Sequence, residues 1–396
     1  MVNVCMLFSS YLESPNGASR FVREFENNKG TFSEYDINVS VVSMDTFHPS
    51  SFSSIVHKRR GGSKLKRKLI DLINKNSILT ILFDMIVYQS RKDRFIDMFM
   101  TLNTIYDIIH CTEPDLCYSL IKRRKLSTEK IFLTMHNNGD ALASEYISRP
   151  ALNTKLGRLY LKRKLKYVFD HVQRIGLTTQ QSVNVFLKLH PEIDHDKVYY
   201  VYNGIESLNI IDARKLPKDR PLKFVCVGTI WERKNQKAIV DALIDMTDEE
   251  RRKISVTFVG DGLLREPLEN LCKRESLGNV SFIGSVPDIS DCLENSDVFI
   301  LVSHSEGLPL SIIQAMRIGL PIVGSNIPGI NEMVEDGKSG YLTGVDFKSV
   351  KETMIKMAKL SDNEYDKMSR ASYQLFLNKF TISKMIMRYS EEYNRQ

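Results

Sequence analysis

The chain has 396 residues, of which 42% are hydrophobic and 26% are charged, and its formal net charge is +7. This length exceeds the size at which a single hydrophobic core stops growing, so we expect a soluble globular protein of two domains. No apolar run approaches the ~20 residues of a transmembrane helix, and the N-terminus lacks the features of a signal peptide, which together predict a cytoplasmic protein.

The positive charge is concentrated in one half of the chain. Residues 1–216 carry a formal charge of +9 and the remainder −2, with basic clusters at 57–60, 64–68, 122–125 and 162–166. Leucines and isoleucines are interleaved between residues 64 and 83, so this segment is either an amphipathic helix resting on the anionic inner face of a membrane or a solvated basic helix. No motif that reads RNA or DNA accompanies the charge, and we expect no nucleic-acid partner.

Strand-like apolar runs alternate with helical patterns along the chain, which is typical of parallel sheets flanked by helices. In the first half, the strands are expected at 2–8, 37–42, 105–110, 130–135, 175–178 and 198–202, with a first helix from about Ser19. After a polar segment at 212–221, further strands are expected at 224–229, 256–260, 280–284, 298–302, 321–324 and 340–342. This predicts an α/β protein with two doubly wound Rossmann-like domains in tandem, residues 1–205 and 206–379. Ligands in such sheets bind beyond the carboxyl ends of the strands, so a central cleft between two facing sheets is the expected site.

Six cysteines are spread along the chain without a CxxC pair, at positions 5, 111, 117, 226, 272 and 292. Most lie in apolar strand-like or helix-like contexts. This pattern favours buried free thiols over disulfides or a zinc site.

The segment SEGLPLSIIQAMRIGLPIV, residues 305–323, is the most informative for function. Glu306 and Gly307 follow the apolar strand, and a helical pattern begins at Leu308, with Pro309 suited to its first turn. The free amides and the dipole of a helix N-terminus form an anion site, for which a diphosphate is the natural occupant. Helical periodicity places Gln314 on the opening turns, so Glu306 and Gln314 could bracket the sugar end and the ribose end of one ligand.

Other polar residues follow predicted strands. His136 could face the cleft as a hydrogen-bond partner or proton handler, although a lone loop histidine is usually neither. Arg233 and Lys234 open the next helix after Gly228, where cations could neutralise a diphosphate leaving group, although two adjacent cations on a turn mean little alone. The Gly-Asp-Gly at 260–262 lacks the third glycine of GxGxxG, and no GxxxxGK[ST], GxSxG or HExxH occurs, which argues against hydride transfer, ATP hydrolysis, a serine triad and a zinc protease.

Taken in order, these residues resemble the retaining GT-B glycosyltransferases of family 4, from the first strand to about residue 345. In that family a Glu, seven residues, Glu motif opens the donor-site helix; Glu306 matches the first position and Gln314 replaces the second. Gly228 and Lys234 match the phosphate-binding turn, and further matches are found at Gly260-Asp-Gly-Leu-Leu-Arg265, Asn203-Gly-Ile-Glu206, Asp297-Val298, Ser303, Pro328-Gly329, Glu332 and Gly337. A glycine-rich first loop is matched by Asn16-Gly17, and a histidine near the reacting sugar by His136.

The resemblance implies retaining transfer of a sugar from a nucleoside diphosphate sugar, most readily a UDP-sugar, to a hydroxyl of a saccharide or polyprenyl-linked saccharide, in cell-surface polysaccharide biosynthesis. It implies catalytic roles for Glu306, His136, Lys234 and Arg233, no metal or other cofactor, and a last helix at about 380–396 that packs back on the first domain. The implied donor-binding residues are Gly17, Asn203, Gly228, Thr229, Gly260, Asp261, Gly262, Val286, Gly307, Leu308, Pro309, Leu310 and Gln314.

Three positions depart from the family pattern. Thr229 stands where an arginine usually binds phosphate, Gln314 offers one carbonyl acceptor in place of a carboxylate, and Asn16 stands where a second glycine is common. These changes leave a catalytically silent nucleotide-sugar binder as an alternative. A soluble transferase acting on small molecules or protein and a nucleotide-sugar epimerase of the same architecture are further alternatives.

Overall fold

The computed structural model describes the chain except for residues 15–16, 49–74, 124–127, 209–213, 218 and 396. It divides into two compact units, Met1–Val201 with Ile386–Gln396, and Tyr202–Met385. The first unit ends slightly before the predicted boundary, which places Asn203 in the second unit. The chain returns to the first unit within its last helix, α19 (Ile382–Asn394).

The first unit is built on a six-stranded parallel sheet in the order β2-β1-β3-β4-β5-β6. Its strands are β1 (Val2–Leu7), β2 (Ile37–Val42), β3 (Ile108–Cys111), β4 (Lys130–Met135), β5 (Arg174–Leu177) and β6 (Val198–Tyr200). Strands β3 and β4 lie at the centre and are almost wholly buried, as expected for apolar runs covered on both faces.

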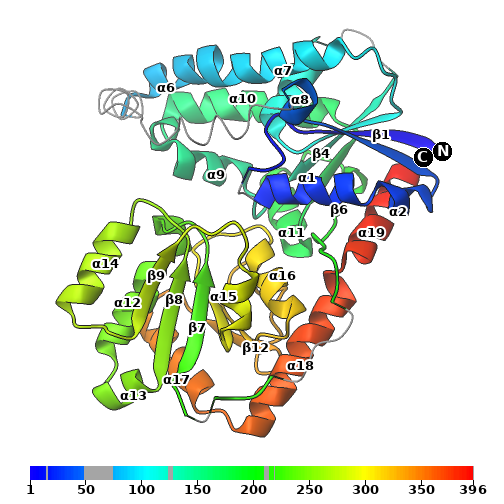
Figure 1. Cartoon of the computed structure of the whole chain (residues 1–396). Coiled ribbons are helices and arrows are strands. Elements are labelled where there is room, and N and C mark those ends of the chain that lie inside the picture. The colour runs from blue at the N-terminus through cyan, green and yellow to red at the C-terminus, as the bar shows by residue number, and fades with distance from the viewer. Residues whose placement is uncertain (15–16, 49–74, 124–127, 209–213, 218, 396) are drawn as a thin grey trace. The chain divides into compact units, whose positions relative to one another are not determined.

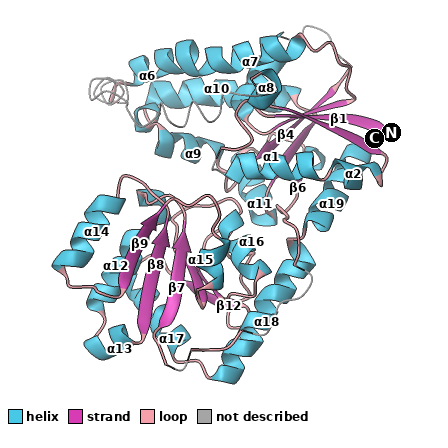
Figure 2. Ribbon diagram, viewed as in Figure 1, coloured by secondary structure: helices cyan, strands magenta, loops and turns pink. Residues whose placement is uncertain are grey.

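Helices cover both faces of this sheet (Figures 1 and 2). They are α1 (Gly17–Asn27), α2 (Lys29–Ser33), α3 (Met44–Phe47), α6 (Ser77–Phe83), the π-helical turn η2 (Asp84–Gln89), α7 (Ser90–Met100), α8 (Pro114–Arg123), α9 (Ala141–Ser148), η3 (Pro150–Leu152), α10 (Lys155–His171), α11 (Gln180–Leu189) and η4 (His195–Lys197). The C-terminal part of α19 joins this unit through buried aromatic packing. His110 on β3 bonds through Nδ1 to the hydroxyl of Tyr393, at 2.5 Å.

The second unit repeats the plan with the order β12-β11-β10-β7-β8-β9, again all parallel. Its strands are β7 (Leu222–Val227), β8 (Ile254–Val259), β9 (Val280–Gly284), β10 (Val298–Leu301), β11 (Ile322–Ser325) and β12 (Gly340–Thr343). Its helices are η5 (Glu232–Lys234), α12 (Gln236–Asp245), α13 (Asp248–Arg252), α14 (Arg265–Arg274), α15 (Ser290–Glu294), α16 (Leu310–Arg317), α17 (Phe347–Ala358) and α18 (Asp362–Lys379). Each predicted strand is therefore confirmed, with ends that shift by a few residues.

The cysteines are all free, and five of the six are buried while Cys292 is half-buried, which confirms the prediction of free thiols. Among the described residues, no helix has the length and apolar content to cross a membrane. The basic clusters at 57–60 and 64–68 lie outside the described residues, as do Asn16 and part of the cluster at 122–125. Of the amphipathic segment predicted for 64–83, the structure describes only the last part, which includes α6.

Candidate functional site

The carboxyl ends of β7 and β8 meet at two glycines that have positive φ angles. Gly228 follows β7 with a φ of 152°, and Gly260 follows β8 with a φ of 141°. A Cβ added to Gly260 would lie 2.1 Å from the carbonyl oxygen of Gly228, and one added to Gly262 would lie 2.1 Å from that of Ile230. The two turns can therefore pack on each other only with glycine at positions 260 and 262, and the small residues leave backbone accessible to a ligand.

Lys234 lies directly over this glycine turn. A Cβ built on Gly228 would be 3.3 Å from Cε of Lys234. The short helix η5 ends at Lys234, and the next residue, Asn235, adopts a left-handed φ of 53°. Its side-chain amide donates to the carbonyl oxygens of Val302 and Val345, at 3.2 and 2.8 Å. Asn235 thus fastens the turn that carries Lys234 to the end of β10.

Glu306 and the two predicted cations form one ion-paired cluster. Oε1 of Glu306 lies 2.8 Å from Nζ of Lys234 and 3.0 Å from Nη1 of Arg233. The side chains of Glu306 and Lys234 are only 8% and 12% exposed, whereas that of Arg233 is 35% exposed. Burial would raise the pKa of Glu306, but the charges of Lys234 and Arg233 outweigh it and hold the pKa below its ordinary value. The site therefore contains a buried, ionised carboxylate with two cations beside it.

The helix α16 begins immediately beyond this cluster. Pro309 is its N-cap and Leu310 its first residue, so the helix begins two residues later than the predicted start at Leu308. No side chain caps this end, and its first amides are oriented to receive an acceptor such as a phosphate oxygen. The preceding Gly307 is backed by Gly329, whose Cβ, if present, would lie 2.0 Å from the Gly307 carbonyl oxygen. The loop is thus held rigidly against the turn after β11.

The other residues predicted for donor binding in this unit differ in accessibility. Gln314 is buried inside α16 at 5% exposure, and Asn203 is buried at 4% with an Oδ1 atom that has no partner among the described residues. Thr229 and Asp261 are exposed, and Val286 is partly buried against the core of the unit. The same edge of the sheet carries the glycine turns, the start of α16 and the three charged residues Lys234, Arg233 and Glu306.

In the first unit, His136 follows β4 at the corresponding edge. Its ring packs edge-on against Phe21 of α1, with centroids 4.6 Å apart. Burial lowers the pKa of His136 to about 4, so the ring is neutral near pH 7 and can donate or accept a hydrogen bond but carries no charge. Its Nε2 atom is buried without a hydrogen-bond partner in the described part of the chain. Gly17 is the exposed first residue of α1.

Sequence reasoning missed further polar groups at this edge. Thr112 follows β3 and Thr178 follows β5, and each has a buried Oγ1 atom without a hydrogen-bond partner in the described residues. Lys92 of α7 pairs with Glu113, and it also donates to Ser9, at 2.5 Å. The threonines could have been found by the criterion that selected His136, namely a polar residue directly after an apolar strand. No local sequence signal connects Lys92 with residues 9 and 113.

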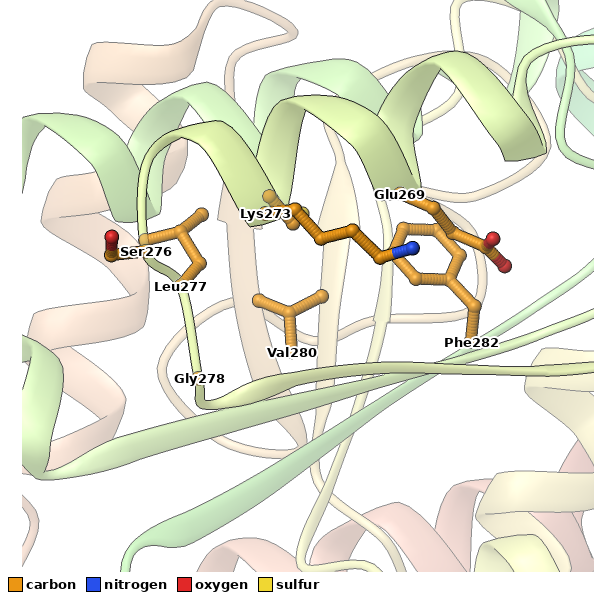
Figure 3. Close-up of a pocket in the computed structure, with 8 residues that line it drawn as sticks. Glu269, Lys273, Ser276, Leu277, Gly278, Val280 and Phe282 are labelled. Atoms are coloured by element: carbon orange, nitrogen blue, oxygen red, sulfur yellow. The ribbon is translucent and has the colours of Figure 1, made fainter.

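A separate hollow of about 540 Å³ lies between α14 and the edge strand β9 (Figure 3). Its walls include Leu277, Val280 and Phe282, with Lys273 and Glu269 at its side (Figure 3). None of the predicted donor residues lines it. Within the described residues, no group of three or more His, Cys, Asp or Glu side chains is arranged to hold a metal ion.

Comparisons with known proteins agree with this architecture. Residues 209–375 match the family model described as glycosyl transferases group 1. The O-antigen biosynthesis glycosyltransferase WclY of Escherichia coli is 26% identical over 300 residues, covering 73% of this chain and 79% of WclY. A UDP-Gal:alpha-D-GlcNAc-diphosphoundecaprenol alpha-1,3-galactosyltransferase of Escherichia coli is 31% identical over 219 residues, covering 51% of this chain and 55% of the relative.

Among solved structures, Anabaena HepE in complex with UDP and glucose superposes with a TM-score of 0.67 at 15% identity, covering 99% of each chain. Sucrose-phosphate synthase from Thermosynechococcus elongatus superposes with a TM-score of 0.71 at 14% identity, covering 99% of this chain and 98% of the synthase. At these identities the likeness concerns the fold, which is the GT-B arrangement of two Rossmann-like sheets. The match to the family model for glycosyl transferases group 1 lies in the second unit of the chain.

Proposed function

We propose that the protein transfers a sugar, with retention of anomeric configuration, from a nucleoside diphosphate sugar to a hydroxyl of a saccharide or lipid-linked saccharide. A UDP-sugar is the proposed donor, and the proposed setting is the assembly of a cell-surface polysaccharide at the inner face of the membrane. No metal or other cofactor is part of the proposal.

The observation that carries this proposal is the Glu306 cluster beside α16. A diphosphate needs positive charge and amide donors, which Lys234, Arg233 and the start of α16 supply within one small region. A sugar needs a fixed hydrogen-bond acceptor, which the ionised carboxylate of Glu306 supplies. The same residues thus provide for both parts of a nucleotide sugar.

The chemistry follows from that placement. The bond between the anomeric carbon and the diphosphate oxygen breaks, and a bond from the acceptor oxygen to the same carbon forms on the same face. The acceptor proton passes to the departing diphosphate, so the protein supplies orientation and electrostatic stabilisation. Lys234 and Arg233 balance the leaving group, and Glu306 holds the sugar hydroxyls. His136, being neutral, offers a hydrogen bond to the sugar without adding charge.

The choice of donor and acceptor class draws on the relatives. One relative is described as using UDP-Gal and a diphosphoundecaprenol-linked sugar, another acts in O-antigen biosynthesis, and HepE has been solved with UDP and glucose. By analogy, we assign this chain a UDP-sugar donor and an acceptor of the saccharide or polyprenyl-linked class. A soluble transferase that modifies small molecules or protein is the alternative within the same chemistry.

A catalytically silent nucleotide-sugar binder is the second candidate, and two departures favour it. Thr229 brings no charge to the diphosphate, and Gln314 is buried where related enzymes carry a carboxylate for the ribose. The binder and the transferase share a donor site, so only turnover distinguishes them. An epimerase is separated from both because it changes the free sugar nucleotide without an acceptor.

The test is a panel of UDP-, GDP-, ADP-, CMP- and dTDP-sugars, scored for thermal stabilisation and nucleotide release with EDTA present. Stabilisation by one donor with slow nucleotide release is the expected result and identifies the donor. Thermal stabilisation without nucleotide release, even with lipid-linked acceptors, would favour the nucleotide-sugar binder over the transferase. No stabilisation by any donor would overturn the assignment of the site, and nucleotide release that occurs without EDTA but not with it would overturn metal independence.

A further inference from the structure

The helical segment formed by α6 and η2 in the first unit exposes an apolar face. Ile78, Leu79, Leu82, Met85 and Ile86 are between 43% and 67% exposed. Their spacing of one, three and four residues places them in a single stripe along the segment. Singly exposed apolar residues are common on protein surfaces, but a continuous stripe of five is a feature of binding surfaces.

The opposite face of the same segment is polar and buried. Thr80, Asp84 and Gln89 are all at most 8% exposed, and Asp84 is fully buried. Asp84 pairs with Arg149, accepts a hydrogen bond from the hydroxyl of Tyr160 at 2.6 Å and lies 3.3 Å from Nζ of Lys164. The segment is therefore anchored to the unit by polar contacts, and its apolar residues are left on the outside. This is the reverse of the usual pattern for a surface helix.

The adjacent helix α10 extends this surface with both apolar and basic residues. It packs against α6, and its exposed residues include Leu156 and Leu159, at 49% and 46%. Between and beyond these leucines lie exposed cations, namely Lys155, Arg158, Lys162 and Arg163. We call the five stripe residues together with Leu156 and Leu159 the apolar stripe, and these four cations its basic rim.

The charges around the stripe select the kind of partner. Between Lys75 and Arg94, the exposed charged residues are Lys75, Arg91 and Arg94, whereas Asp84 is buried and Asp93 is ion-paired with Arg123. The surface therefore presents apolar and cationic groups without an exposed free carboxylate in this stretch. A second copy of this chain would bring one basic rim against another. The basic segment at 57–68 would likewise be repelled by it.

We propose that the apolar stripe and its basic rim dock the first unit on an anionic lipid bilayer. The apolar side chains would enter the boundary between headgroups and acyl chains, and the cations would contact lipid phosphates. The long side chains of Lys and Arg suit this arrangement, because their stems can lie along apolar surface while the charged ends reach the headgroups. The inference goes beyond glycosyl transfer, since a membrane-docked protein of this kind need not be active for the contact to form.

The test is sedimentation of the full-length protein with vesicles of phosphatidylcholine, with and without phosphatidylglycerol. The variant Leu82→Glu/Ile86→Glu places two charges in the stripe, and Arg158→Glu/Lys162→Glu reverses part of the rim. The control is Leu189→Glu on α11, because Leu189 is 48% exposed, close to the 46% of Leu82. Near-ultraviolet circular dichroism and stabilisation by nucleotide establish that each variant is folded.

We expect the wild-type protein and Leu189→Glu to bind the anionic vesicles and not the neutral ones. Each double variant should lose at least about tenfold in vesicle affinity, and added salt should weaken binding of the wild type. Absence of wild-type binding to anionic vesicles, or equal binding by the stripe variant, would overturn the proposal. If light scattering instead shows a concentration-dependent dimer that only the stripe variant abolishes, the face binds a second copy of the chain and the proposal is overturned. Loss of vesicle binding with unchanged nucleotide binding separates this inference from the proposed function.

Discussion

Replacing Lys234 with Met removes one charge from the donor site and little else. The methionine keeps an unbranched apolar stem over Gly228, where Cε of Lys234 now lies 3.3 Å from the position of a glycine Cβ. The lost interaction is the 2.8 Å ion pair with Glu306, whose side chain is only 8% exposed. The variant therefore leaves a buried carboxylate with Arg233 as its remaining cation.

The expected cost can be derived from that geometry. Removing one partner of a buried ion pair typically destabilises a protein by about 3–5 kcal/mol. Arg233 stays 3.0 Å from Glu306 but is 35% exposed, so solvent weakens the attraction by which it compensates for the lost lysine. We therefore expect Lys234→Met to lower the free energy of unfolding by about 3 kcal/mol. For a unit of this size, a loss of about 3 kcal/mol lowers the melting temperature by roughly 6–12 °C.

A double-mutant cycle turns this expectation into a measurement of the pair. Thermal unfolding of wild type, Lys234→Met, Glu306→Gln and the double variant should give a double-variant loss smaller than the sum of the single losses, by about 0.5–3 kcal/mol. The matched control is Lys237→Met, because Lys237 pairs with Asp241 at 2.6 Å but is 60% exposed, and its loss should be only about 0.3–0.5 kcal/mol. Strictly additive losses, or a Lys234→Met loss no larger than that of the control, would refute the electrostatic account of the site.

Three further predictions concern backbone, charge and pH. Gly260→Ala should destabilise the second unit by about 3 kcal/mol or more and abolish stabilisation by nucleotide, because its Cβ would lie 2.1 Å from the Gly228 carbonyl oxygen. The control Gly278→Ala, whose Cβ meets nothing within 4 Å, should change neither property. Equal melting temperatures of the two variants would contradict this. Thr229→Arg should tighten nucleoside diphosphate binding by about tenfold in calorimetry through a charge-assisted hydrogen bond, and unchanged affinity would show that Thr229 does not face the diphosphate. Burial lowers the pKa of His110 to about 3 and that of His136 to about 4. Below pH 6.5 the unfolded chain therefore binds protons that the folded chain does not, down to about pH 3 for His110 and about pH 4 for His136. Stability should be constant above pH 6.5 and lower by about 2 kcal/mol per histidine at pH 5, and wild-type melting temperatures that do not fall between pH 7 and 5 would contradict the buried neutral state.

Much of the fold could be predicted because the parallel strands are short apolar runs buried on both faces, such as Val298–Leu301. The predictions were less accurate at the ends of helices, where capping determines the first and last residue. Pro309 was expected inside the first helical turn, but its ψ of 112° makes it the N-cap of α16. The two compact units divide between Val201 and Tyr202, a few residues before the predicted boundary at 205.

The sequence predicts candidate site residues one by one, but it does not predict their contacts. Glu306 and Lys234 were each selected for a donor role, yet no spacing rule predicts that they form an ion pair. For the segment 64–83, an amphipathic helix on a membrane was one of the two interpretations of the sequence, and its described part exposes Ile78, Leu79 and Leu82. The burial of Asp84 against Arg149 and Lys164, by contrast, has no local sequence signal.

The most direct test of the proposed function is acceptor-dependent transfer with the donor that the nucleotide panel identifies, comparing wild type with Glu306→Ala and determining the anomeric configuration of the product by NMR. The account predicts a product with the donor's configuration from the wild type, and at least about a hundredfold slower transfer by Glu306→Ala with nucleotide binding retained. An inverted product, or transfer by Glu306→Ala at the wild-type rate, would contradict it.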